Sequence, residues 1–122
     1  MAHLITTLGL KSAADLEMIL PHEHIFVDVR PPEQVVEVAV DATDVIALMG
    51  PEIEKARAVG VTALVECSPV GVGRRVDLVR AVSEATDFPI VVPTGIYREP
   101  WIPAWAHAAG EDTFTYGMLY QL

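Results

Sequence analysis

The segment "VTALVECSPVGVGRRVDLVRAVSEATDFPIVVPTG", residues 61–95, contains a strand, a helix and a second strand in close succession. Thr62–Cys67 is a short apolar run typical of a buried strand. Valines recur at helical spacing along Arg74–Thr86, and Pro89–Gly95 reads as another buried strand. This order predicts a βαβ unit, in which the two strands run parallel.

Segments on either side of this unit extend the same alternation. Glu17–His24 is predicted to be a strand, although Pro21 cannot donate a hydrogen bond to a neighbouring strand. Thr43–Val59 is predicted to be a helix that ends at Gly60 and is interrupted at Gly50-Pro51. Another helix is expected from about Thr113. Its apolar residues at helical spacing are Phe114, Met118 and Leu122.

Three strands alternating with helices indicate an α/β fold with a parallel sheet. Such a sheet is normally covered on both faces, and three strands leave an open edge. A complete (β/α)8 barrel takes roughly 250 residues. We therefore expect residues 1–122 to be the N-terminal portion of one domain, the first three βα units of a (β/α)8 TIM-type barrel.

The composition limits the classes of function. The 122 residues are 52% hydrophobic, but no apolar run reaches the roughly 18 residues that a membrane helix needs. The formal charge of -9, with Arg74 and Arg75 as the only adjacent basic pair, argues against binding to nucleic acid or to an anionic membrane. A lone cysteine and the absence of a signal-peptide pattern lead us to expect a cytoplasmic protein.

Two histidines stand one residue apart at the end of the first predicted strand. Alternate residues of a strand point to the same side, so His22 and His24 can present two imidazoles to one point. That arrangement suits a divalent metal such as zinc, although a catalytic zinc site needs at least three protein ligands. The competing interpretation is a pair of hydrogen-bonded histidines with no metal.

The histidine motif and the βαβ unit together carry a resemblance to a known family. "LPHEHIFVD", followed by "VTALVECSPVGVGRRVDLVRAVSEATDFPIVVPTGIYREPW", resembles the N-terminal part of the phosphotriesterase-like family of the amidohydrolase superfamily, from roughly Gly9 to Trp105. The resemblance implies a distorted βα barrel that holds two divalent metals, expected to be zinc. A hydroxide bridging the metals would attack a phosphoryl or carbonyl centre.

The same resemblance implies roles for individual residues. His22 and His24 would be ligands of the more buried metal, and Tyr97 would line the substrate pocket. The family also uses a carboxylated lysine, two histidines from later strands and a final aspartate, none of which can be placed in this sequence. In particular, Lys55 falls on a predicted helix and His107 comes too early in the chain.

Other residues near the predicted strand ends have two interpretations each. Glu66 either contacts a metal or positions a ligand histidine from behind, or it faces solvent or pairs with an arginine. Trp101 either walls the substrate pocket or packs its loop against the barrel or a second subunit. "GVGRR", Gly71–Arg75, is expected to be a tight turn rather than a phosphate cradle, and Cys67 a small buried hydrophobe.

The leading hypothesis is a metal-dependent hydrolase of a small-molecule ester, which is a lactone, a carboxyl ester or an organophosphate triester. The alternative is a catalytically inactive fragment that self-associates or binds a single metal weakly. A third hypothesis is a small doubly wound module that binds a phosphate-bearing ligand. The open sheet edge leads us to expect either a homo-oligomer or association with a C-terminal barrel half that is missing here.

Overall fold

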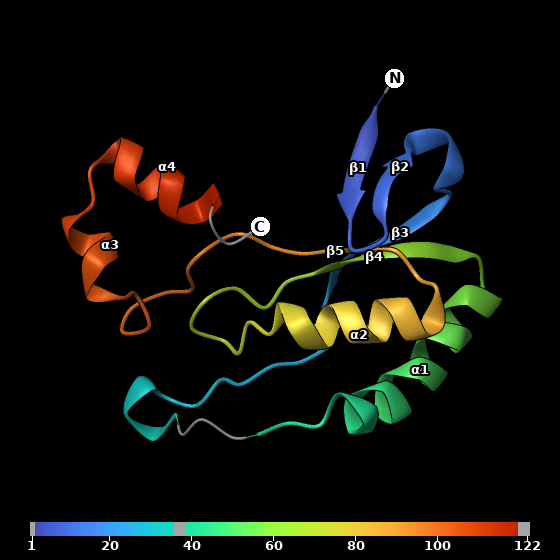
Figure 1. The fold of residues 1–122 in the computed structure, drawn as a ribbon, viewed down its shortest axis with the longest axis horizontal. Coiled ribbons are helices and arrows are strands. Elements are labelled where there is room, and N and C mark those ends of the chain that lie inside the picture. Colours follow the sequence, from blue (N-terminus) through green and yellow to red (C-terminus); the bar gives the residue numbers. More distant parts are fainter. Residues whose placement is uncertain (1, 36–38, 120–122) are drawn as a thin grey trace.

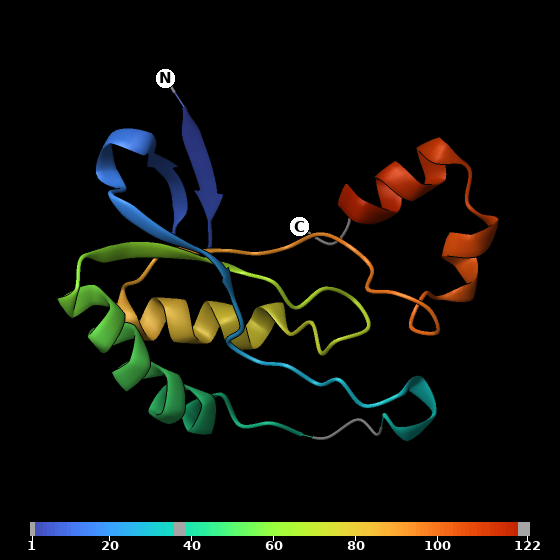
Figure 2. The same cartoon turned by 180° about the vertical axis from the view of Figure 1, so that it is seen from behind.

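A three-stranded parallel sheet in the order β3-β4-β5 forms the centre of the computed structural model, which describes residues 2–35 and 39–119. The two helices that follow β3 and β4 lie side by side along one face of the sheet (Figure 1; Figure 2). The bounds are β3 Met18–Glu23, α1 Ala42–Ala58, β4 Val61–Glu66, α2 Val76–Thr86 and β5 Ile90–Val91. The predicted α/β fold with parallel strands is thus confirmed.

The hydrophobic core lies between β4, β5 and the two helices. Its buried members come from β4, β5, α1 and α2 and from the loop residues Ile25 and Phe88. The two helices contribute because each turns one apolar stripe toward the strands. The most deeply buried of these apolar side chains are Ile53, Leu78, Val82, Phe88 and Ile90. The opposite helix face is solvated, and there Arg80 donates to Glu84 at 2.7 Å with helical i, i+4 spacing.

Helix α1 begins where Asp41 accepts a hydrogen bond from the backbone N–H of Thr43 at 2.8 Å. It then continues without a break through Pro51, so the predicted interruption is wrong. Proline removes one backbone donor, but Val45 and Ile53 are buried in the core on either side of it. Their packing holds the two halves of the helix in line.

Helix α2 and strand β5 are both shorter than predicted. Helix α2 begins at Val76, and Arg75 occupies the N-cap position instead of a helical one. Strand β5 comprises two residues, because Pro93 has no N–H with which to continue the pairing. An isolated bridge between Val70 and Ile96 restores parallel pairing farther along.

An N-terminal hairpin, which the sequence patterns do not reveal, precedes the sheet. Strands β1 His3–Thr6 and β2 Gly9–Ser12 pair antiparallel and lie on the side of the sheet away from α1 (Figure 1). The turn is tied to the core, since the N–H of Thr7 donates to the carbonyl of Ile90 at 2.8 Å and the Thr7 hydroxyl contacts that of Ser83 at 2.5 Å.

Two short helices, α3 Ala104–Ala108 and α4 Glu111–Leu119, form a separate arm at one end of the molecule (Figure 1). Helix α3 is absent from the sequence prediction, and α4 begins two residues before the predicted Thr113. The rings of Trp105 and Phe114 lie 6.3 Å apart and join the two helices. Leu122, predicted to belong to the last helix, lies outside the described residues.

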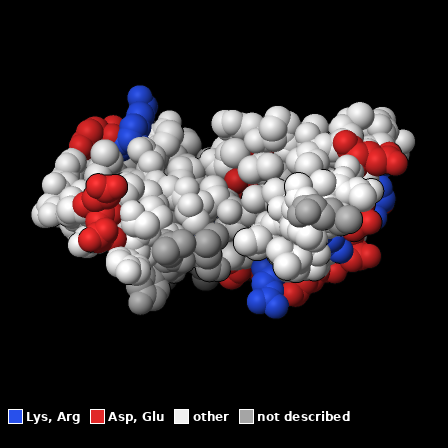
Figure 3. Space-filling view, turned by 90° about the horizontal axis from the view of Figure 1, so that it is seen from above, with Lys and Arg blue, Asp and Glu red and all other residues white. Residues whose placement is uncertain are grey.

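The surface carries few continuous charged areas on the face shown in Figure 3. There, acidic and basic side chains stand in small separate groups among uncharged atoms. Within residues 2–35 and 39–119, no helix is long and apolar enough to cross a membrane.

Replacing Gly73 with alanine tests how tightly the loops after β3 and β4 are packed. Gly73 has a φ of +83°, and a Cβ there would lie 2.4 Å from the backbone nitrogen of Asp28. We expect Gly73→Ala to lower the free energy of unfolding by about 3 kcal/mol, from left-handed strain and overpacking together. Urea denaturation followed by circular dichroism measures it.

Gly60→Ala is the matched control, because Gly60 has a φ of +94° with open space around the added carbon. It should cost only the conformational part, about 1 to 2 kcal/mol. Equal losses for the two variants would contradict the close approach of the two loops.

Candidate functional site

The loops that leave the carboxyl ends of the three parallel strands are hydrogen-bonded to one another. The Cys67 N–H donates to the Glu23 carbonyl at 2.8 Å, which extends the β3–β4 pairing by one step. Val70 exchanges hydrogen bonds with the loop after β5: its N–H donates to the Gly95 carbonyl at 3.1 Å, and its carbonyl accepts from Tyr97 at 2.9 Å. The candidate site residues therefore lie on a connected frame at one end of the sheet.

The histidine pair lies where β3 ends. His22 is the penultimate residue of the strand, and His24 is the first residue after the strand. Both side chains are exposed, and their ring centroids lie 5.2 Å apart at an interplanar angle of 71°. Two imidazoles this close can serve as ligands of one divalent cation. Among the described residues, no third His, Cys, Asp or Glu joins them in a metal-binding group.

His24 is held from behind by the loop after β4. Its Nδ1 lies 2.9 Å from the hydroxyl of Ser68, which in turn donates to the carbonyl of Phe26 at 2.8 Å. Ser68 is 1% exposed. Its backbone N–H donates to Oε2 of Glu66 at 2.8 Å, so a short chain of hydrogen bonds runs from Glu66 through Ser68 to the imidazole.

Glu66 is 2% exposed, which rules out the interpretation that it faces solvent. Its Oε1 has no hydrogen-bond partner among the described residues, an expensive state for a buried carboxylate. The carboxylate acts electrostatically on Arg74, whose pKa is lowered by burial and raised by Glu66. Glu66 reaches His24 through Ser68 and not by direct contact.

Two aromatic residues stand together on the loop after β5. Tyr97 and Trp101 make an edge-to-face contact with centroids 5.5 Å apart, and the guanidinium of Arg98 lies 5.4 Å from both rings. They sit against Gly71, where a Cβ would come within 2.7 Å of Trp101. The side chain of Tyr97 is 41% exposed and Trp101 is half-buried, so the pair can form a wall that faces outward.

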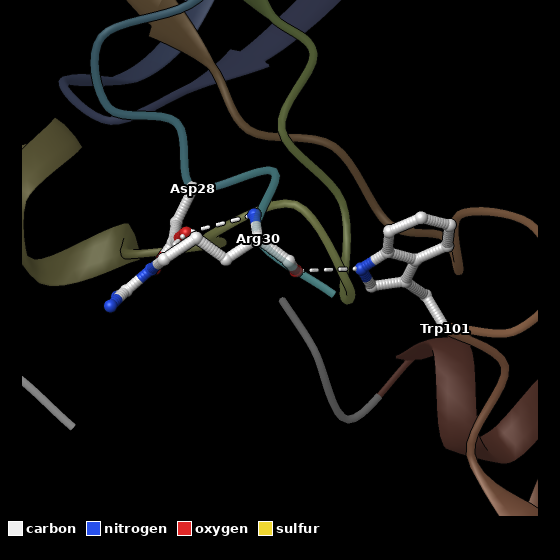
Figure 4. Close-up of polar contacts among 3 residues, drawn as sticks. All are labelled: Asp28, Arg30 and Trp101. Atoms are coloured by element: carbon white, nitrogen blue, oxygen red, sulfur yellow. Dashed lines mark hydrogen bonds and ion pairs between the residues drawn. The ribbon is translucent and has the colours of Figure 1, made fainter. Parts of the chain in front are cut away.

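Trp101 also joins the loop after β3. Its indole Nε1 donates to the carbonyl of Arg30 at 3.0 Å, while the Arg30 side chain folds back onto the carboxylate of Asp28 (Figure 4). The Arg30 Nε lies 2.8 Å from Oδ1 of Asp28. Hydrogen bonds from the Arg30 side chain and backbone lower the pKa of Asp28 from 3.8 to about 2.

The glycine-rich turn has a structural explanation. Gly71 and Gly73 both have positive φ, and the turn places the Val72 carbonyl 3.1 Å from the N–H of Asp28. Cys67 is half-buried instead of fully buried as predicted. Burial and the nearby Glu66 raise the pKa of its thiol, which disfavours the reactive thiolate.

The structure thus brings together the predicted site residues in two groups, His22 with His24 and Tyr97 with Trp101. Neither of two hollows in the described part of the chain is lined by His22 or His24. One, of about 250 Å³, is lined by Asp28, Val35, Val70, Gly71, Gly73 and Arg74, and the other, of about 720 Å³, lies between β1, α2 and β5.

The arrangement is that of an α/β protein whose candidate site lies at the carboxyl edge of a parallel sheet. Its sequence matches the Phosphotriesterase family over residues 2–119. The chain belongs to the phosphotriesterase family, which confirms the predicted resemblance.

Relatives of known name give the extent of this similarity. The chain is 31% identical over 111 residues to the "Phosphotriesterase homology protein" of Mycobacterium tuberculosis, an alignment that covers 90% of this chain. It spans 34% of the length of that curated relative.

Solved structures agree. A triple mutant of organophosphorus hydrolase from Deinococcus radiodurans superposes with a TM-score of 0.79 at 28% identity, covering 96% of this chain and 38% of that one. A mutant PTE-like lactonase from the same organism gives 0.72 at 28% identity, over 86% and 34% of the two chains. The phosphotriesterase from Mycobacterium tuberculosis gives 0.70 at 29% identity, over 87% and 33%.

Sequence reasoning missed two residues that shape the site. Ser68 lies two residues after Glu66, and a small polar residue beside a predicted strand end was the available signal. Arg30 precedes two prolines, and Asp28 at i−2 was the available signal for the local ion pair.

Removing the Arg30 side chain should release the Asp28 carboxylate. The depressed pKa means that the ion pair stabilises the folded loop above about pH 4, and that this contribution is lost as the pH falls toward 2. We expect the Asp28 carboxyl to titrate near pH 2 in the native chain and at a clearly higher pH, still below 3.8, in Arg30→Ala, which keeps the hydrogen bond from the backbone N–H of residue 30. Carboxyl-carbon NMR shifts measured against pH give both midpoints.

Arg75→Ala controls for the general loss of a positive charge. Arg75 donates to Asp77 at 2.8 Å, so this variant should raise the pKa of Asp77 and leave Asp28 unchanged. A native Asp28 midpoint near 3.8 would show that the pair does not form in solution.

Proposed function

We propose that this chain is part of a metal-dependent hydrolase of esters, with His22 and His24 as metal ligands. Family membership and similarity to hydrolase structures support the reaction class. The observation that carries the metal assignment is the close, exposed imidazole pair at the carboxyl end of β3. In parallel α/β folds, catalytic groups gather at this end of the strands.

The donor set fits part of such a site. His22 and His24 supply two nitrogen ligands, and the remaining ligands of a two-metal centre would come from outside the described residues. When bound, a pair of divalent metal ions, expected to be zinc, supplies an activated hydroxide and polarises the bond to be cleaved. The protein's part here is to hold both imidazoles at the edge of the sheet.

The substrate we propose is a small neutral ester: a lactone, a carboxyl ester or an organophosphate triester. Tyr97 and Trp101 form an apolar wall on the neighbouring loop, suited to the non-reacting portion of such a molecule. The guanidinium of Arg98 lies over both rings. The resemblance of the "GIY" sequence that ends at Tyr97 to the family favours a lactone among these esters.

We further propose that β3, β4 and β5 are the first strands of a (β/α)8 barrel. The parallel order and the helices on one face support this, as does coverage of 38% or less of the similar structures. The other face of this sheet and its two edge strands would then contact the rest of the barrel or a second copy of the chain.

A second candidate is that residues 1–122 alone bind one metal weakly and do not catalyse. It is favoured by the absence of a third ligand within the described residues and by the apolar side chains exposed near the β3 edge. Examples are Met18, Val27 and Val29, which are at least 49% exposed. Self-association through this edge would cover them.

Zinc binding and hydrolysis separate the two candidates. Elemental analysis of the purified chain, with paraoxon and lactone hydrolysis assayed at added zinc, should show about two metals and turnover if a second copy or further chain completes the site. About one weakly bound zinc without turnover would support the second candidate. In either case His22→Ala and His24→Ala should remove the bound zinc, because each deletes one of two paired ligands.

His107→Ala is the matched control, since it removes an exposed imidazole that pairs with Glu99 on the α3 side of the molecule. It should leave zinc binding unchanged. Zinc retained in both His22→Ala and His24→Ala would sink the metal assignment.

A further inference from the structure

Ser68 is buried directly behind one of the two proposed ligands, with its hydroxyl shared between two partners. The hydroxyl oxygen lies 2.8 Å from the carbonyl of Phe26 and 2.9 Å from Nδ1 of His24. A carbonyl oxygen only accepts hydrogen bonds, and a serine has a single hydroxyl hydrogen. That hydrogen is therefore committed to Phe26.

The direction of the second hydrogen bond follows from the first. With its hydrogen engaged, the Ser68 oxygen can only accept, so Nδ1 of His24 must carry the hydrogen and donate it. A neutral imidazole with a hydrogen on Nδ1 keeps a lone pair on Nε2. Nε2 makes no hydrogen bond to a described residue, so this lone pair is available to a ligand.

We propose that Ser68 is a positioning residue that fixes His24 as the Nδ1–H tautomer and so presents Nε2 for metal binding. The part of this inference that concerns metal binding rests on the proposed function. The part that concerns the tautomer of His24 rests on the hydrogen bonds alone. Metal-bound histidines commonly donate their second N–H to such a partner, which fixes the ring and strengthens the ligand.

Ser68 is itself held rigidly. Its backbone N–H donates to Glu66, and the neighbouring Cys67 N–H donates to Glu23 beside the histidines. At 1% exposure the hydroxyl has no room to rotate toward solvent. By contrast, His22 has no hydrogen bond from either ring nitrogen to a described residue, so the two histidines differ in how strongly their tautomers are set.

The tautomer can be read directly from nitrogen-15 shifts and two-bond couplings in the histidine rings of the metal-free chain, at alkaline pH where imidazoles are neutral. We expect native His24 to be Nδ1–H. His107 is an internal reference of opposite kind, because its Nε2 lies 3.1 Å from a Glu99 carboxylate and should carry the hydrogen. His24→Gln identifies the His24 signals.

Variants at Ser68 then test whether its hydroxyl sets the tautomer of His24. Ser68→Ala should move His24 toward the Nε2–H tautomer and weaken zinc affinity about 10- to 100-fold by calorimetry, whereas Ser68→Thr, which keeps the hydroxyl, should preserve the tautomer. Ser83→Ala is the matched control: this serine is also fully buried and donates to a carbonyl, that of Phe88, without touching a histidine. It should leave the tautomer of His24 unchanged.

The outcomes are distinct. A native His24 that is Nε2–H, or a mixture, overturns the proposal even if Ser68→Ala fails to fold. An unchanged tautomer in a folded Ser68→Ala overturns it as well. A third outcome is that His24 is Nδ1–H in the native chain and changes tautomer in Ser68→Ala, but the chain binds no zinc. This outcome would support the role of Ser68 in setting the tautomer and contradict the metal assignment of the proposed function.

Discussion

The central strand β4 and the loop that leaves it are the element on which the other parts of the site depend. After β4 ends, the chain still bonds to both neighbours: Cys67 to the end of β3, and Val70 to the loop after β5. Ser68 bonds to Phe26 in the same stretch. Because parallel strands all point the same way, one central loop can reach the carboxyl ends of both adjacent strands. The loop after β4 therefore fixes the position of the histidine pair relative to the aromatic pair.

Much of the fold could be read from the sequence because its parallel core is locally encoded. Buried strands and an amphipathic helix have clear apolar periods, and Gly60 marks a helix stop. What could not be read depended on distant contacts. The β1–β2 hairpin is held by Thr7 reaching Ile90, and the continuity of α1 through Pro51 depends on packing on both sides of the proline.

The site was partly predictable for a related reason. The spacing of His22 and His24 sets their common direction, and a strand pattern reveals it. The burial of Glu66 and the position of Ser68 arise from packing between loops that are more than 40 residues apart in the sequence, as in the contact of Ser68 with Phe26. A single sequence contains no period that reports such contacts.

The indole of Trp101 connects the loop after β5 to the loops after β3 and β4. It packs on Gly71 from the loop after β4 and donates to Arg30 from the loop after β3. Three loops are thus mechanically coupled through one ring. An insertion or deletion in any one of these loops would displace the other two. Changes in substrate specificity should therefore require coordinated changes in all three loops, and exchange of a single loop should seldom suffice.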